Sequence, residues 1–425
     1  MLELKVDVPY GREWRTIDVE EENLIGVFKP ADIEQPPLTR EDIAFSIASP
    51  IGCEKLDRWV GPGKTVAIAV DDNTRITPVH DVLVVLQEKL TSLGVKKNDI
   101  LVIVALGTHR KMTDEEMKKK FGSEILEEMQ VISHEWDNPS ELRRMGNLPN
   151  GVPILINKHF IDADIRIGIG NIVPHFTSGW SGGSKILLPG LAGAETVAGM
   201  HYYGAKTLPN AIGRADNVAR ELMDDFARKV GLHMIINTVL TRDGKIAGIY
   251  SGDPVKAHRK GIEHCKRIYG IPIPEAADIT IVSSHPADIE FWQSMKGLYS
   301  ADLCTKKNGG ILLITPSPEG LSVVHKDWGD MLACSSKELE EQIERGEIED
   351  VTAASIALCV IKTRETPYKI ALYSEGISQE QAEQLHFEKV SNPQEGLEYL
   401  NRELGKDSKK LVLTHGGESL PILEG

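Results

Sequence analysis

The sequence is poor in cysteine, and its cysteines have the spacing of neither a disulfide framework nor a zinc site. The 425 residues include five cysteines, an odd number, and no Cys-x-x-Cys pair. A chain of this length buries a large core without disulfides. We therefore expect buried, reduced thiols in a cytoplasmic enzyme. The five positions are Cys53, Cys265, Cys304, Cys334 and Cys359.

Long apolar runs and an excess of basic residues are also missing. No apolar run approaches the roughly 20 residues that span a bilayer, and the first residues lack the basic-then-apolar order of a signal peptide. The net charge is −15, from 63 acidic and 48 basic residues. Such a charge weighs against nucleic acid or an acidic membrane as a partner. The composition therefore favours a cytoplasmic protein with a small-molecule partner.

Short apolar runs alternate with amphipathic stretches along the chain. Buried strands are predicted at residues 65–70, 100–106, 165–169 and 234–240. Helices are predicted at 79–93, 114–121, 192–203, 214–230 and 255–268. Continuous apolar strands alternating with helices are typical of a parallel sheet covered on both faces. The predicted fold class is therefore α/β, with mostly parallel, helix-covered sheets.

A domain boundary is expected near residues 270–277, where Pro272 and Pro274 stiffen a connector. A second α/β unit follows, with strands at 279–282, 311–314 and 370–373 and helices at 288–307, 336–346 and 350–363. The strand at 410–413 is expected to return to the first domain. The prediction is an N-terminal catalytic and cofactor-binding domain (1–272 plus about 400–425), a C-terminal substrate-binding domain (275–398), and an active-site cleft between them.

Polar and titratable residues follow three of the apolar runs. In open α/β sheets, ligands bind outside the carboxyl ends of the strands. Each segment alone fits a turn with helix-capping chemistry, and Asp72 could simply pair with Arg75. Arginine and histidine are not needed to make turns, however, so the three segments together predict a ligand site. The segment after the first strand suits a phosphate or carboxylate; the residues concerned are Asp72, Asn73, Thr74 and Arg75, then His109, then His175.

The segment at 175–190, HFTSGWSGGSKILLPG, is dense in glycine and polar residues. Gly179, Gly182 and Gly183 permit close backbone approach to a ligand. Lys185 follows, but the order Gly-Gly-Ser-Lys differs from the Gly-Lys-Ser/Thr of a phosphate loop. Lys185 is a candidate covalent attachment point, because amines condense with carbonyl-type carbon. The alternative is a solvated lysine on a flexible loop.

Two helices carry further candidates. His201 lies on the predicted helix at 192–203, and a lone histidine makes no metal site by sequence rules. Gln293 and Lys296 are three residues apart on a helix, so they share a face and could hold a carboxylate or hydroxyl together. The alternatives are a structural histidine and an ordinary surface pair.

Taken together, these motifs resemble the nickel-dependent lactate racemase family, over nearly the whole chain. They are Asp-x-Thr-Arg at 72–75, Gly-x-His-Arg at 107–110, His175 followed by Ser-Gly-Gly-x-Lys, His201, and Gln-x-x-Lys-Gly at 293–297. The resemblance implies a nickel-pincer nucleotide, a pyridinium-3,5-bisthiocarboxylate mononucleotide with a bound nickel ion. It also implies cofactor-biosynthesis proteins that load this group.

The resemblance assigns roles residue by residue. Lys185 would carry the cofactor and His201 would be the one protein ligand to nickel, a coordination set that suits soft sulfur donors with one imidazole. His109 and His175 would be the acid/base pair. Substrate would be bound by Arg75, Gln293 and Lys296. The cofactor and reaction centre would be lined by Asp72, Asn73, Thr74 and Arg75.

The residue types agree with inversion at C2 of a 2-hydroxy acid. The C2 proton is too weakly acidic for a histidine near neutral pH to remove. A histidine can instead take the hydroxyl proton while the C2 hydrogen leaves as hydride to an electrophilic cofactor. The product is a planar 2-oxo acid, and return of hydride to its other face inverts the centre. Two histidines then allow either enantiomer to react.

Two features leave the substrate open, and two other functions are possible. Trp292 stands where the resemblance leads us to expect tyrosine, and the loop at 317–324 lacks the Gly/His-rich run of the lactate enzymes. A nicotinamide-dependent 2-hydroxy acid dehydrogenase is one alternative, although no Gly-x-Gly-x-x-Gly follows the early strands. The other is a non-enzymatic nucleotide- or phosphate-binding protein.

Overall fold

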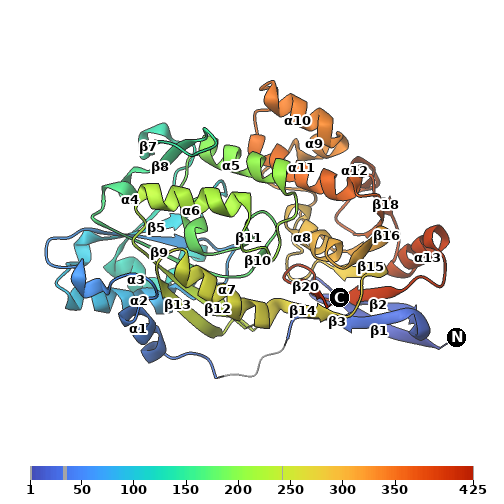
Figure 1. Cartoon of the computed structure of the whole chain (residues 1–425), viewed down its shortest axis with the longest axis horizontal. Coiled ribbons are helices and arrows are strands. Elements are labelled where there is room, and N and C mark those ends of the chain that lie inside the picture. The colour runs from blue at the N-terminus through green and yellow to red at the C-terminus, as the bar shows by residue number, and fades with distance from the viewer. Residues whose placement is uncertain (1, 32–35, 242, 425) are drawn as a thin grey trace. The chain divides into compact units, whose positions relative to one another are not determined.

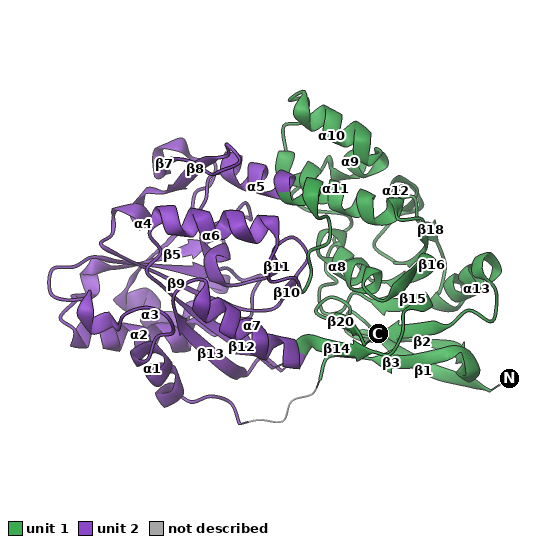
Figure 2. Cartoon of the chain, in the orientation of Figure 1, with its two compact units in different colours: residues 1–31, 204–213, 269–425 green, residues 32–203, 214–268 purple. Residues whose placement is uncertain are grey.

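The computed structural model describes residues 2–31, 36–241 and 243–424, which fall into two compact units (Figures 1 and 2). Unit 1 comprises Met1–Ala31, Gly204–Gly213 and Tyr269–Gly425. Unit 2 comprises Asp32–Tyr203 and Arg214–Ile268. Each unit is built on its own six-stranded, predominantly parallel sheet, so the predicted α/β class is confirmed.

The sheet of unit 2 has the strand order β13-β12-β9-β4-β5-β6. All neighbours are parallel except β12 and β13. The chain adds β5 and β6 on one side of β4 and β9 and β12 on the other, so the strand order reverses at β4, where open α/β sheets bind ligands. The bounds are β4 Val66–Asp71, β5 Ile100–Ala105, β6 Gln130–Ser133, β9 Ile165–Asn171, β12 Met234–Leu240 and β13 Ile246–Gly252.

Helices cover both faces of this sheet, which explains why its strands are apolar on both sides. One apolar cluster joins the inner sides of three helices, α1 (Arg40–Ala48), α2 (Val79–Ser92) and α3 (Asp114–Glu128), to alternate residues of the strands. A second cluster on the other face includes residues of α4 (Lys158–Asp162), α5 (Ala194–Thr207), α6 (Val218–Val230) and α7 (Lys256–Tyr269). A short hairpin of β7 (Leu142–Asn147) and β8 (Pro153–Asn157) adds to unit 2.

The sheet of unit 1 has the order β18-β17-β16-β15-β19-β3, with every neighbour parallel. A two-stranded parallel sheet pairs β14 (Gly270–Ile273) with β20 (Leu420–Leu423). The helices of the unit are α8 Phe291–Asp302, α9 Trp328–Ala333, α10 Ser336–Glu344, α11 Val351–Glu365, α12 Gln379–Gln384 and α13 Pro393–Leu404. The strands of the main sheet are β3 Leu24–Phe28, β15 Ala277–Ser283, β16 Thr305–Ile314, β17 Lys369–Tyr373, β18 Glu388–Lys389 and β19 Lys410–Leu413.

Both chain ends differ from the predicted domain assignment. The strand at 410–413 does not return to the first domain, because β19 pairs with β15 and β3 in the sheet of unit 1. The N-terminal hairpin, β1 (Glu3–Tyr10) and β2 (Glu13–Glu20), also belongs to unit 1. Its apolar face packs in one cluster with residues of β15, β16 and β17. The sheet of unit 1 is thus completed from both ends of the sequence, which no local pattern reveals.

Helix boundaries differ where a capping residue or a glycine fixes them. The helix predicted at 214–230 begins at Val218, because the Asn217 side chain caps it by accepting from the Arg220 N–H. The helix predicted at 114–121 continues to Glu128 across a kink at Gly122. The helix predicted at 288–307 is shorter, because β16 already starts at Thr305.

The described residues bear on the expectations about membrane spans and disulfides. Among these residues, no helix is long and apolar enough to cross a membrane. None of the five cysteines is in a disulfide; Cys265, Cys304 and Cys359 are buried, and Cys53 and Cys334 are half-buried.

Candidate active site

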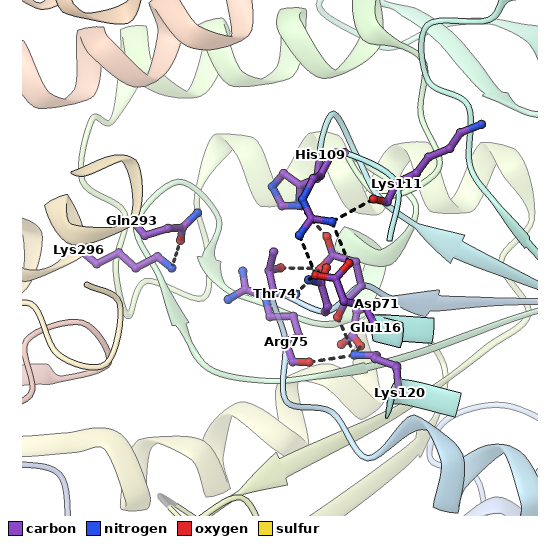
Figure 3. Close-up of polar contacts among 12 residues, drawn as sticks. Asp71, Thr74, Arg75, His109, Lys111, Glu116, Lys120, Gln293 and Lys296 are labelled. Atoms are coloured by element: carbon purple, nitrogen blue, oxygen red, sulfur yellow. Dashed lines mark hydrogen bonds and ion pairs between the residues drawn. The ribbon is translucent and has the colours of Figure 1, made fainter. Parts of the chain in front are cut away.

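The loops after β4 and β5 meet through a histidine–aspartate pair. His109 Nδ1 lies 2.7 Å from Asp72 Oδ2; the carboxylate is 5% exposed and the imidazole 46% exposed (Figure 3). A carboxylate oxygen accepts, so Nδ1 carries the hydrogen and the lone pair of neutral His109 is on Nε2. This is the arrangement by which an aspartate holds a catalytic histidine in the tautomer of a base.

Asp72 is held as a carboxylate by its surroundings. Burial raises the pKa of Asp72. The hydrogen bonds from His109 and Thr74 and the positive charge of Arg75 outweigh this effect and bring the pKa down to about 2. Asp72 Oδ1 accepts from both the backbone N–H of Thr74, at 3.1 Å, and its hydroxyl, at 2.5 Å. The Arg75 N–H donates to the Asp72 carbonyl at 3.2 Å, which closes a tight turn. The guanidinium of Arg75 makes no hydrogen bond to any of the described residues, so it is available to an anion.

Helix α3 contacts both of these loops. Glu116 accepts from Asn73 Nδ2 at 2.8 Å and binds both terminal nitrogens of Arg110, at 2.7 and 2.8 Å. The ammonium of Lys120 bonds to Asp71 and to two backbone carbonyls of the turn after β4 (Figure 3). Asn73 therefore faces helix α3.

His175 follows β9 in a two-strand element of β10 (Pro174–His175) and β11 (Gly179–Trp180). Its Nδ1 accepts from the Thr177 N–H, with the two nitrogens 3.3 Å apart, so a neutral ring carries its hydrogen on Nε2. The Thr177 hydroxyl lies 3.1 Å from the same Nδ1, and the ring stacks on Phe176. His109 and His175 thus follow β5 and β9, the two strands that flank β4, and their Nδ1 atoms have different partners, a carboxylate and a threonine.

Buried polar side chains form hydrogen bonds to the backbone of the glycine loop at 179–183, before Lys185. Arg220, 1% exposed, donates to the carbonyls of Trp180 and of Gly182, the latter at 3.1 Å. His258 Nε2 lies 2.8 Å from the Ser181 carbonyl. The Gly183 N–H donates to the Asn237 side chain at 2.7 Å. With its carbonyls held inward, the loop is fixed rather than flexible.

The glycines of this loop are required by close packing. A Cβ on Gly182 would lie 2.8 Å from Asn237 Oδ1, and one on Gly183 would lie 2.8 Å from the His258 ring; both residues have positive φ. Lys185 lies just beyond, half-buried, in a short 3-10 turn at Gly183–Ile186. The structure therefore favours a defined position for Lys185 over a solvated lysine on a flexible loop.

His201 lies on α5, as predicted. Its Nδ1 is 2.9 Å from the Val197 carbonyl one turn earlier, and a carbonyl only accepts, so Nδ1 carries the hydrogen. Neutral His201 then has its lone pair on Nε2, the tautomer that a histidine needs to bind a metal through Nε2. Among the described residues, no group of three or more His, Cys, Asp or Glu side chains forms a metal site.

Gln293 and Lys296 lie on α8 of unit 1 and share a helix face as predicted. Lys296 Nζ donates to Gln293 Oε1 at 2.6 Å (Figure 3). The neighbouring Trp292 stacks on His325 with ring centroids 4.2 Å apart, and Asp350 Oδ2 lies 2.6 Å from His325 Nδ1. The tryptophan beside the predicted substrate residues is thus fixed by a second aromatic ring.

Several residues of this region escaped the sequence analysis. Lys120 is the last of three consecutive lysines, and only the fold distinguishes it from the exposed Lys118 and Lys119. Arg220 and His258 occupy helices whose polar residues resemble ordinary surface positions. Thr177 could have been suspected from its position two residues after His175 in the dense segment.

Comparisons with known proteins show which family the chain resembles. Residues 10–213 match the model of the lactate racemase N-terminal domain. A lactate racemase of Lactiplantibacillus plantarum is 31% identical over 323 residues, 74% of this chain and 75% of the relative. A lactate racemase of Thermoanaerobacterium thermosaccharolyticum is 30% identical over the same shares of both chains.

Two solved structures have the same fold as this chain. The lactate racemase apoprotein from Thermoanaerobacterium thermosaccharolyticum superposes with a TM-score of 0.86 and 25% identity, over 99% of this chain and 100% of that one. A Thermotoga maritima protein of known crystal structure, 23% identical, shares the fold with a TM-score of 0.69 over 92% of this chain and 100% of its own. The chain belongs to the lactate racemase family of isomerases.

Proposed function

We propose that this protein is a racemase or epimerase that inverts C2 of a 2-hydroxy acid. The observation that carries the proposal is the His109–Asp72 pair at 2.7 Å, at the carboxyl end of the strand where the sheet order reverses. A histidine held in the base tautomer by a buried carboxylate suits removal of a hydroxyl proton. The positive charge of Arg75 beside it suits the carboxylate of such a substrate.

The residues present fit the nickel-pincer nucleotide that the family resemblance implies. His201 is in the tautomer of an Nε2 metal ligand. Lys185 follows a rigid loop whose glycines leave no room for side chains. Asn171 Oδ1 and Thr238 Oγ1, on paired residues of β9 and β12 at the carboxyl edge, are buried and lack partners among the described residues. Buried polar atoms of this kind call for a ligand or water.

The residues of this chain would divide the work as follows. Lys185 would hold the cofactor covalently and His201 would bind its nickel. The cofactor would be lined by Asp72, Asn73, Thr74 and Arg75, and the side chain of Asn73 is oriented by its hydrogen bond to Glu116. When bound, this group supplies an electrophilic acceptor for the hydrogen on C2. The loading would depend on cofactor-biosynthesis proteins, and the protein would act in the cytoplasm.

The proton steps fall to the two histidines. His109 Nε2 would take the hydroxyl proton of one enantiomer, and the positive charge on its ring would be stabilised by Asp72. His175 would serve the other enantiomer. Its Nδ1 accepts from the Thr177 N–H, so its neutral ring carries the hydrogen on Nε2, as a proton donor does. Arg75, Gln293 and Lys296 would bind the substrate, and the two cations would stabilise negative charge on its oxygens. Trp292, which stacks on His325, precedes Gln293 in the sequence, and we propose no particular substituent on C2 of the substrate.

The cofactor assignment is tested by intact mass and nickel content. Protein made anaerobically in a host that builds the cofactor is compared with the Lys185→Ala variant. We expect a covalent adduct of nucleotide size and about one nickel per chain in the first, and neither in the second. Absence of both from the unmodified protein, in a host that loads another family member, would contradict the assignment.

A further inference from the structure

We infer that Lys120 is a positioning residue for the acid/base histidine: its buried ammonium fixes the turn that carries Asp72, and Asp72 orients His109. The inference rests on the proposed function for its catalytic meaning, whereas its structural part concerns this chain alone. Lys120 lies on α3, outside the strands and loops that supply the predicted site residues.

The contacts of Lys120 use all three donors of its ammonium group. Nζ lies 2.7 Å from Asp71 Oδ1, 2.6 Å from the Asp72 carbonyl and 2.9 Å from the Arg75 carbonyl. The side chain is 6% exposed and that of Asp71 is 13% exposed. An ammonium group has three N–H donors and no acceptor. Lys120 is therefore fully satisfied in this one geometry, and any shift of the turn would cost it a charge-assisted bond.

The two carbonyls that Lys120 binds belong to the first and last residues of the turn. Between them the Arg75 N–H bonds back to the Asp72 carbonyl, so that oxygen accepts from both the turn and the ammonium. The same residue, Asp72, directs its side chain to His109. Lys120 thus holds the backbone of the same residue whose carboxylate sets the histidine tautomer.

A second buried lysine shows what a purely structural role looks like. Lys410 of unit 1 is fully buried and bonds to the carbonyls of Lys406 and Ser408, at 2.8 and 3.0 Å, and to Glu20 at 3.3 Å. These contacts lie at the start of β19, whereas those of Lys120 lie at the carboxyl end of β4, where the site is. Lys120 and Lys410 are both buried ammonium groups bound to backbone carbonyls. They differ in that the backbone bound by Lys120 belongs to Asp72, which contacts His109.

The first test reads out His109 directly, in protein without cofactor. Diethyl pyrocarbonate acylates neutral imidazole nitrogen, and peptide mass spectrometry gives its rate at His109 relative to the exposed His159. We expect Lys120→Met to lower the rate at His109 several-fold, toward that of Asp72→Asn. Lys119→Met, on the exposed side of the same helix, and Lys410→Met should leave the rate unchanged. An unchanged rate in folded Lys120→Met would overturn the inference.

The second test uses the loaded enzyme and the smaller variant Lys120→Ala. We expect kcat to fall by roughly 10²-fold, the cost of a displacement of about 1 Å in a reacting group, with KM changed far less. Ethylammonium, which fits the deleted end of the side chain, should restore part of kcat. Turnover within about threefold of the unmodified protein, or a lower melting temperature without any rescue, would assign Lys120 a structural role only.

The two tests distinguish failure of the proposed function from failure of the inference about Lys120. If the unmodified, loaded protein inverted no 2-hydroxy acid, the proposed function would fail, while the acylation rate of His109 would still decide whether Lys120 positions it. If Lys120→Met does not fold, Lys120→Ala with ethylammonium present during purification supplies the protein for the acylation experiment.

Discussion

At the scale of single residues, Asp72 is the side chain that sets the tautomer of the proposed base, His109. Asp72→Asn keeps the shape but replaces the carboxylate that accepts the His109 Nδ1–H. We expect kcat to fall on the order of 10²–10⁴-fold, the range of a lost general base, with little change in KM. Steady-state racemisation rates measure this. Asp81→Asn is the matched control, because Asp81 pairs with His80 Nδ1 at the surface, 62% exposed; a comparable loss there would remove the argument.

The pKa of Asp72 also predicts how stability depends on pH. It is about 2 in the folded protein, against roughly 3.9 in an unfolded chain. A depressed pKa stabilises the fold above pH 4, and this stabilisation disappears as the pH falls toward 2. At about 1.4 kcal/mol per pH unit, the contribution is on the order of 2 kcal/mol. The melting temperatures of the unmodified protein and Asp72→Asn should therefore converge between pH 4 and pH 2, and a constant difference would contradict the burial and bonding of this carboxylate.

At the scale of elements, the segment 179–185 should behave as a rigid support. Gly183→Ala would place a Cβ 2.8 Å from the His258 ring at a φ of +61°. We expect a loss of about 1–3 kcal/mol in stability and less cofactor on Lys185. Thermal unfolding and nickel content measure the two effects.

Gly151→Ala separates the two causes of that loss. Gly151 has a φ of +86° and no atom within 4 Å of the added Cβ, so it carries the backbone cost without the steric one. Equal destabilisation of the two variants would show that packing against His258 does not hold the loop.

The elements predictable from sequence are those whose apolar pattern is local. The strand at Met234–Leu240 has the predicted bounds, because all seven residues are buried in a sheet covered on both faces. The hairpin of β1 and β2 was missed, although Val6, Val8, Ile17 and Val19 alternate along it. Its membership of unit 1 could not be predicted at all, because the residues that it packs against lie in β15, β16 and β17, far along the chain.

The site follows the same division. Residues directly after strands, such as His109 and His175, could be proposed from the sequence because the ends of parallel strands converge on one sheet edge. Lys120 and Arg220 act through backbone carbonyls brought near by the fold. A single sequence does not distinguish such donors from surface charges.

At the scale of the whole molecule, the chain belongs to the lactate racemase family of isomerases. The net charge of −15 would repel an acidic substrate. Under the proposed function, Arg75 and Lys296 would supply the local positive charge that offsets this repulsion. Trp292 stands where the family resemblance leads us to expect tyrosine.

The most direct test of the central claim follows a single enantiomer labelled with deuterium at C2. Nickel-loaded protein is incubated with each of a panel of D or L 2-hydroxy acids, and chiral chromatography with mass spectrometry gives the composition and the label. The account predicts the opposite enantiomer with deuterium retained at C2, abolished in the variant with both His109→Ala and His175→Ala. Loaded protein that forms no opposite enantiomer from any acid, or inversion that persists without both histidines, would contradict it.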